Sequence, residues 1–275
     1  MSSIPNEYEQ YMTKRNTDFI ETFSNLVSES PFMGVLFVVG TVILLFAGLN
    51  EINFRMKYAL PPKYTSTYQQ IDPQQEPIQI EPSSAKPFML TASNGDKYNI
   101  LPVADYSISA MVVAKNTNVW LRGVMNSAFD NIALIDFGFL CGKVANDETL
   151  KYVRFQSKKI LSSARELRPM PNYWKSQQNA EDYFVSQNLS MDYFFSHMSH
   201  VHVIPADNNI MATLMRLHKK DIVKLNGYLV DINYKDGRTS RTSLSRSDTN
   251  ETSRGNGACE IMYVTNVQVG NKIYQ

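Results

Sequence analysis

The longest apolar run of the chain lies near its N-terminus, over residues 30–50. It reads SPFMGVLFVVGTVILLFAGLN and contains no charged residue between Glu29 and Glu51. An α-helix needs about 20 apolar residues to cross a hydrocarbon core of roughly 30 Å, and in lipid a helix satisfies its own backbone hydrogen bonds. The run therefore predicts one transmembrane helix over 30–54. A buried core helix is the alternative, but the run has no polar face.

Polar residues 1–29 precede this run. The run begins too late and lacks the basic segment of a cleavable signal peptide, so the pattern predicts an uncleaved signal anchor. The basic residues that flank it are Lys14 and Arg15 before, and Arg55, Lys57 and Lys63 after. A difference of one charge favours a cytoplasmic C-terminal domain only weakly, because long domains translocate largely regardless of charge. The residues alone leave the orientation open.

A proline- and glutamine-rich segment follows the anchor over residues 61–87. It contains six prolines and few large apolar residues, a composition that favours an extended, polyproline-like chain over a packed core. The segment is therefore predicted to be a tether between the membrane and a folded domain.

Residues 88–275 show the alternating patterns of a β-rich domain. The Asn94-Gly95 pair predicts a hairpin, residues 221–234 form the clearest strand, and residues 259–269 form a final strand. Asp207 is expected to cap a short helix. The predicted fold is α+β, with one or two helices and a mainly antiparallel sheet that takes, in one interpretation, the form of an OB-like barrel.

Composition excludes several classes of function. The 275 residues include 27 basic and 26 acidic side chains, for a net charge of +1, so no general attraction to nucleic acid is expected. The chain contains no P-loop, GxGxxG, GxSxG or HExxH motif. An enzymatic role is therefore not the favoured interpretation.

Three of the four histidines lie close together, at His197, His200 and His202. Imidazole is a common zinc ligand, and three such ligands leave a fourth position open for catalysis. On a strand, however, His200 and His202 share one face and His197 lies on the other. Additional carboxylate ligands are conceivable at Glu260, Asp207 and Asp248. The alternative is that the histidines only form hydrogen bonds at the entry to a strand.

A polar stretch near residue 245 offers a different kind of site. On a strand, Arg241, Ser243 and Ser245 alternate onto one face, and an arginine fork with hydroxyls can hold a carboxylate or phosphate. The candidate binding residues are Arg241, Ser243, Ser245, Arg246, Asp248 and Glu260. The alternative is an exposed strand face whose Arg246–Asp248 pair fixes a turn.

The two cysteines, Cys141 and Cys259, form no metal-binding motif with each other. A disulfide between them and two separate buried thiols both remain open. A nucleophilic Cys259 would need an adjacent base or a helix N-terminus. Its position at the start of an apolar strand favours a buried, inert thiol.

The C-terminal third carries a series of motifs, in the order HxxxxHxIPAD, KxDIVKLxGYLV, RTSLSRxDT and GNGACE. In these motifs the chain resembles a family of membrane-anchored bacterial envelope proteins. The resemblance implies an inner-membrane protein with one membrane span and a periplasmic C-terminal domain. It implies no activity.

Three functions follow as hypotheses, one of which is an OB-like nucleic-acid binder on the cytoplasmic side. The first is a single-pass, non-enzymatic binding or scaffold domain of the bacterial envelope, which has no cofactor and contacts another envelope protein or a glycan. It would bind through residues 241–248 and 197–202. The alternative is a metal-dependent hydrolase, with zinc as its cofactor, that uses the cluster of His197, His200 and His202.

Overall fold

The computed structural model describes residues 31–92, 95–117, 128–153, 155–158, 166–169, 177–245 and 259–275. The predicted binding residues Arg246 and Asp248, and the segment 1–29, lie outside these ranges. The chain divides into two compact units, residues 1–52 and residues 53–275. Each unit is described by itself.

Helix α2 (Pro31–Lys57) occupies the apolar run of the sequence. Many large apolar side chains in its first twenty residues are exposed: Phe32, Val35, Leu36, Phe37, Val38, Val39, Val42, Ile43, Leu44, Leu45, Phe46 and Leu49. Among the described residues, no helix has the length and apolar character needed to cross a membrane.

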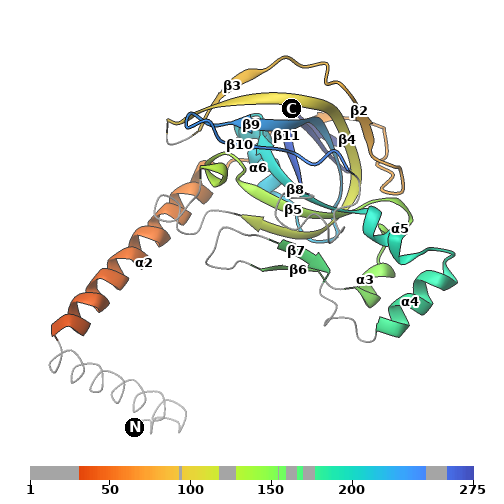
Figure 1. Ribbon diagram of the computed structural model, residues 1–275, viewed down its shortest axis with the longest axis horizontal. Coiled ribbons are helices and arrows are strands. Elements are labelled where there is room, and N and C mark those ends of the chain that lie inside the picture. The colour runs from red at the N-terminus through yellow and green to blue at the C-terminus, as the bar shows by residue number, and fades with distance from the viewer. Residues whose placement is uncertain are drawn as a thin grey trace, which may run out of the picture. The chain divides into compact units, whose positions relative to one another are not determined.

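The second unit is built on one large sheet (Figure 1). Its strands are β1 (Thr65–Ser66), β2 (Ile78–Ile80), β3 (Phe88–Thr91), β4 (Lys97–Thr117), β5 (Ile135–Leu140), β8 (Met198–Pro205), β9 (Ile222–Asn233), β10 (Thr239–Ser240), β11 (Glu260–Val269) and β12 (Lys272–Tyr274). The strand order is β1-β12-β11-β8-β5-β4-β9-β10, while β2 and β3 pair with β4, and β11 also pairs with β9. All pairs are antiparallel except β8 with β11. The predicted mainly antiparallel α+β fold is confirmed.

The sheet curls because β4 is long and irregular. Its pairing register shifts between Pro102 and Ala104 and again between Val112 and Ala114, and such bulges bend a strand and increase its twist. The sheet as a whole is not a closed barrel, because β1, β2, β3 and β10 each pair along one edge only within the described residues.

Two predicted local features are present. Strands β3 and β4 pair as a hairpin, and Gly95 between them has a φ of +86°, a conformation that glycine adopts readily. Asp207 caps α6 (Asn208–Arg216), because its Oδ1 accepts a hydrogen bond of 2.8 Å from the Ile210 amide. The helix buries Met211 and Leu214 in the main core.

A second, aromatic core lies under short helices: α3 (Thr149–Tyr152), α4 (Gln177–Ser186) and α5 (Met191–Ser196). Phe184 and Phe194 are fully buried there, with ring centroids 5.1 Å apart. Two 3₁₀ turns, η1 (Phe129–Asn131) and η2 (Gly142–Val144), precede and follow β5. The small sheet of β6 (Phe155–Lys158) and β7 (Glu166–Pro169) completes the fold.

The proline-rich segment 61–87 is packed on the domain rather than extended away from it. Strand β1 pairs with β12, and β2 pairs with β4. Ser83 Oγ donates a hydrogen bond of 2.7 Å to Asp105. The prediction of a free tether is corrected in this respect, because the polar residues of the segment find partners on the sheet.

The C-terminal end of α2 belongs to the same unit as the sheet. Phe54 and Tyr58 are buried in the main core. The Arg216 guanidinium donates to the carbonyl oxygens of Tyr58, Ala59 and Leu60 at 2.8–3.1 Å. These bonds join the segment directly after α2 to the end of α6.

Candidate metal centre

Two of the three predicted histidines come together on β8. His200 and His202 are separated by one residue on this strand and therefore share a face. Their ring centroids are 4.7 Å apart. Strand β8 lies between β5 and β11, so both neighbours can place side chains beside the imidazoles.

Cys259 supplies a third ligating atom. It directly precedes β11, which runs parallel to β8 with Glu260 opposite Val201. The Cys259 Sγ lies 3.1 Å from the His200 Nδ1. The potential ligand atoms of His200, His202 and Cys259 all lie within 4.8 Å of one another.

Asp136 on β5 orients one of these histidines. It is paired with His202 across the antiparallel strands, it is 4% exposed, and its Oδ1 lies 2.7 Å from the His202 Nδ1. Because a carboxylate only accepts hydrogen bonds, Nδ1 carries the proton, and Nε2 is left to ligate. A carboxylate behind a ligating histidine is the usual arrangement at metal sites, where it fixes the ring and makes it a better ligand.

The ring of His202 is also held by an apolar neighbour. Phe129 in η1 meets it edge-on, with centroids 5.0 Å apart and planes at 90°. His202 is therefore fixed by a buried carboxylate and by an aromatic ring.

One thiolate and two imidazoles form a ligand set suited to zinc and unsuited to magnesium or calcium. Around tetrahedral zinc, a sulfur and a nitrogen ligand are separated by about 3.6 Å, from bond lengths of about 2.3 and 2.05 Å. The 3.1 Å between Cys259 and His200 is shorter than this. It matches a thiol–imidazole hydrogen bond, so an ion would widen the pair by about half an ångström.

His197 is not part of this cluster, and its inclusion in the predicted metal site is corrected. It follows α5, its Nε2 lies 2.7 Å from Glu76 Oε1, and its ring stacks on Tyr193 at 3.7 Å. Helix α5 ends at Ser196 and β8 begins at Met198. His197 therefore lies between these two elements, and its side chain does not share the face of β8 that carries His200 and His202.

Two of the other predicted carboxylates, Glu260 and Asp207, also lie outside the cluster, whereas Asp248 is outside the described residues. Glu260 is buried and accepts a hydrogen bond of 2.9 Å from Ser199. These two side chains occupy the face of the strands that carries Val201 into the core, opposite to His200. Asp207 is the helix cap described above.

The predicted binding stretch lies alongside Cys259. The Ser243 amide donates to the Cys259 carbonyl at 3.1 Å. Strand β10 ends at Ser240, however, so Arg241, Ser243 and Ser245 do not alternate on a strand as predicted. Instead, Ser243 Oγ donates to the Ser245 carbonyl and accepts from its amide, which makes a local turn.

The cysteines do not form a disulfide. Cys141 is buried, as one of the two interpretations held, with its Sγ 3.5 Å from the His197 carbonyl. Cys259 is partly exposed and lies beside an imidazole, which corrects the expectation of a buried, inert thiol. No spacing in the sequence signals this residue, because it lies 59 positions after His200 and the parallel pairing of β8 with β11 brings the two together.

Comparison of the chain with protein-family models, with curated proteins and with solved structures finds no match.

Proposed function

We propose that the domain binds one transition-metal ion, with zinc as the best fit, through His200, His202 and Cys259, and that the chain is a metal-dependent hydrolase. The observation that carries this proposal is the convergence of three ligand atoms within 4.8 Å, one of them on a histidine held by the buried Asp136. Three protein ligands leave a fourth position for water, whose pKa zinc lowers to about 7.

The roles of the residues follow from their chemistry. Cys259 supplies a negative ligand that binds soft and borderline metals. His202 ligates through Nε2 while Asp136 accepts the proton on its Nδ1. The carboxylate also stabilises the positive charge that the ring acquires when it ligates a cation.

The metal content of the full-length protein, purified in detergent without added metal, tests the proposal. We expect about one equivalent by elemental analysis, and its loss in His202→Ala and in Cys259→Ser. His218→Asn is the matched control, because His218 is a highly exposed histidine outside the cluster, and His197→Gln should also keep the metal. Folded wild-type protein without metal, or equal loss in the His218 variant, would refute the proposal.

A non-enzymatic binding domain of the bacterial envelope is the second candidate. It is favoured by the exposure of Arg241, Leu244 and Ser245 on the surface next to Cys259. The partner would be an envelope protein or a glycan. Arg241→Ala should then abolish retention of that partner from the native membrane fraction, and unchanged retention would count against this candidate.

Although none of the described helices qualifies as a membrane span, we infer from the uncharged sequence of residues 30–50 and the exposed side chains of α2 that this helix is an integral membrane anchor. The family resemblance supports a bacterial inner membrane and a periplasmic domain. Val39→Arg should release the protein from membranes at alkaline pH, whereas Thr41→Ser should not. A cysteine placed at Ser3 should react with an impermeant reagent only after lysis.

We also propose that the curled centre of the sheet is OB-like. Support comes from β9, which pairs with both β4 and β11, and from β8–β11, which is the parallel pair of the described sheet. Nuclear Overhauser contacts between Leu225 and Val267 across β9 and β11 would agree with this arrangement, and their absence would contradict it.

A further inference from the structure

Residues 66–77, here called the strap, cross the outside of the domain and are fastened at both ends. At the first end, the Thr67 amide donates to the Asn271 carbonyl at 2.9 Å. Close by, the buried side chain of Gln268 donates to the Gln69 carbonyl at 2.6 Å. The start of the strap is therefore joined to β11 and to the turn before β12.

The second fastening depends on a histidine. The Gly142 amide donates to the Pro73 carbonyl at 2.9 Å, and the Glu76 carboxylate lies 2.7 Å from the His197 Nε2. The His197 side chain is 10% exposed and that of Glu76 is 60% exposed. The histidine is therefore largely buried in the rest of the domain, here called the body, and the glutamate lies on the surface.

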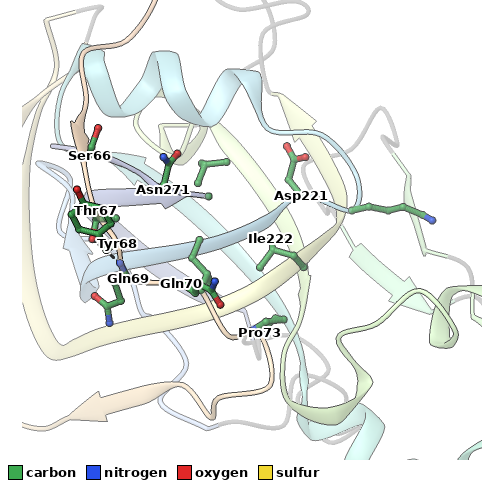
Figure 2. A pocket seen from close by; sticks show the side chains of 13 residues that line it. Ser66, Thr67, Tyr68, Gln69, Gln70, Pro73, Asp221, Ile222 and Asn271 are labelled. Carbon is green, nitrogen blue, oxygen red and sulfur yellow. Dashed lines mark hydrogen bonds between the residues drawn. The ribbon is translucent and has the colours of Figure 1, made fainter.

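An open groove of about 970 Å³ lies between the strap and the body (Figure 2). Residues 66–71 and Pro73 of the strap form one side of it, and Asp221, Ile222 and Asn271 are among the residues of the other side. The position of the strap therefore sets the width of this groove.

His197 is placed between two hydrogen-bond acceptors. Its Nδ1 lies 2.7 Å from the Tyr193 carbonyl oxygen, and its Nε2 lies 2.7 Å from the Glu76 carboxylate. A carbonyl oxygen and an ionised carboxylate only accept, so with Glu76 ionised both bonds form only when both ring nitrogens carry hydrogen. That species is the positively charged imidazolium.

A neutral ring loses one of these two hydrogen bonds in either tautomer. With hydrogen only on Nδ1, the Glu76 bond disappears. With hydrogen only on Nε2, a lone pair faces the Tyr193 carbonyl at 2.7 Å. The Ser196 hydroxyl lies 3.1 Å from Nδ1, but it already donates to the same carbonyl at 3.0 Å.

Three titratable groups lie around His197: the Glu76 carboxylate of the strap, the Tyr193 phenol of α5, and the Cys141 thiol after β5, which lies against the His197 carbonyl. The backbone amide of Lys143 in η2 donates to the Tyr193 hydroxyl. Of these, Glu76 is the group that is negatively charged at neutral pH. The imidazolium is therefore stabilised chiefly by the strap.

The body holds the imidazole in place. A Cβ added to Gly142 would lie 2.4 Å from the His197 Cδ2, so the ring packs directly on this glycine. The Tyr193 ring also stacks on the imidazole. Because the ring is held in place, the pair separates by movement of Glu76, through rotation of its exposed side chain or together with the strap.

We propose that the strap is a pH-sensitive latch: imidazolium at His197 holds Glu76 and keeps the strap closed, and loss of the proton frees residues 72–77 and widens the groove. Imidazole changes its charge between about pH 5 and pH 8. The latch is independent of the metal centre, because His197 makes its contacts outside that cluster.

Hydrogen exchange of the full-length protein, read by mass spectrometry at pH 5.5 and pH 8.0 and corrected for intrinsic exchange rates, tests the latch. Exchange of peptides from residues 66–77 should rise about tenfold at the higher pH, the effect of losing one charge-assisted hydrogen bond. Glu76→Gln should abolish this rise and leave exchange at pH 5.5 already fast. His218→Asn, which changes an exposed histidine near the groove, should behave as wild type.

Hydrogen exchange of the strap that does not change with pH would overturn the latch, and so would a rise in exchange that persists in Glu76→Gln. A rise that disappears in His218→Asn would also overturn it, because the pH sensor would then lie elsewhere. A second measurement needs no substitution: ¹⁵N spectra of the wild-type protein should show hydrogen on both ring nitrogens of His197 at pH 5.5. A neutral ring at that pH would refute the proposal.

Discussion

Asp136 is the residue on which the geometry of the candidate centre depends most. Because it fixes the proton on His202 Nδ1, Asp136→Asn should weaken metal affinity about 10- to 100-fold, the usual effect of changing a partner behind a ligating histidine. Competition with a chromophoric chelator measures this. Asp221→Asn, outside the cluster, serves as the control, and equal affinities in both variants would show that Asp136 does not support the ligand.

Cys259 can be tested as a ligand by spectroscopy. In protein loaded with cobalt(II), a thiolate bound to the ion should give a near-ultraviolet charge-transfer band that Cys259→Ser lacks. Cys141→Ser should keep the band, because Cys141 is buried beside the His197 carbonyl and away from the cluster. A band that survives in Cys259→Ser would mean that the metal binds elsewhere.

Lys115 gives a pH dependence with a definite sign. Its ammonium donates to the carbonyls of Met215 and Leu217 at the end of α6, and burial lowers its pKa. Between that lowered pKa and the ordinary value near 10.4, the unfolded chain binds more protons than the folded one, so the free energy of unfolding rises with pH.

The difference in unfolding free energy between wild type and Lys115→Met should therefore grow in favour of wild type from pH 7 to pH 9.5. Urea denaturation at the two pH values measures it, and Lys219→Met, on the exposed turn after α6, controls for the loss of a surface charge. A difference that stays constant or shrinks would contradict the assignment.

At the scale of elements, the contact between β9 and β11 depends on Gly227. A Cβ there would lie 1.9 Å from the Tyr263 carbonyl oxygen, so Gly227→Ala must push the two strands apart. We expect a loss of about 3 kcal/mol in the free energy of unfolding. Gly237→Ala, with open space around it and a positive φ, should cost only about 1 kcal/mol, and equal losses would contradict the close contact.

The elements that the sequence predicts well are those with a local signal. The apolar run predicts α2, the Asp207 cap predicts α6, and Gly95 marks the β3–β4 hairpin. The strap has no such signal, because it is held by backbone groups and by single long-range contacts such as Glu76 with His197. Because such contacts leave no local pattern, the proline- and glutamine-rich composition of the strap looks the same as that of a free tether.

The candidate site was predictable only in part. His200 and His202 follow from the two-residue period of a strand. Asp136 and Cys259 are brought to them by pairing with β5 and β11, and strand pairing between distant segments leaves no periodicity in a single sequence. Sequence proximity also groups His197 with these two histidines, because it does not show that a helix ends directly before His197.

At the scale of the whole molecule, the unit 53–275 includes the last turn of α2. Arg216 joins the segment that directly follows that turn to α6, through the carbonyls of residues 58–60. Arg216→Ala should therefore raise hydrogen exchange of residues 53–63 at least several-fold while strands β4 and β9 stay protected. Lys219→Ala is the control, and unchanged exchange in Arg216→Ala would show that the guanidinium does not hold this turn.

The parallel pairing of β8 with β11 has a consequence for biogenesis. His200 and His202 leave the ribosome well before Cys259, and the thiol reaches them only when the last long strand has aligned along β8. A growing chain therefore has two imidazoles but no complete ligand set. If the cluster holds an ion as proposed, the complete ligand set exists only once β11 has been made and has paired with β8.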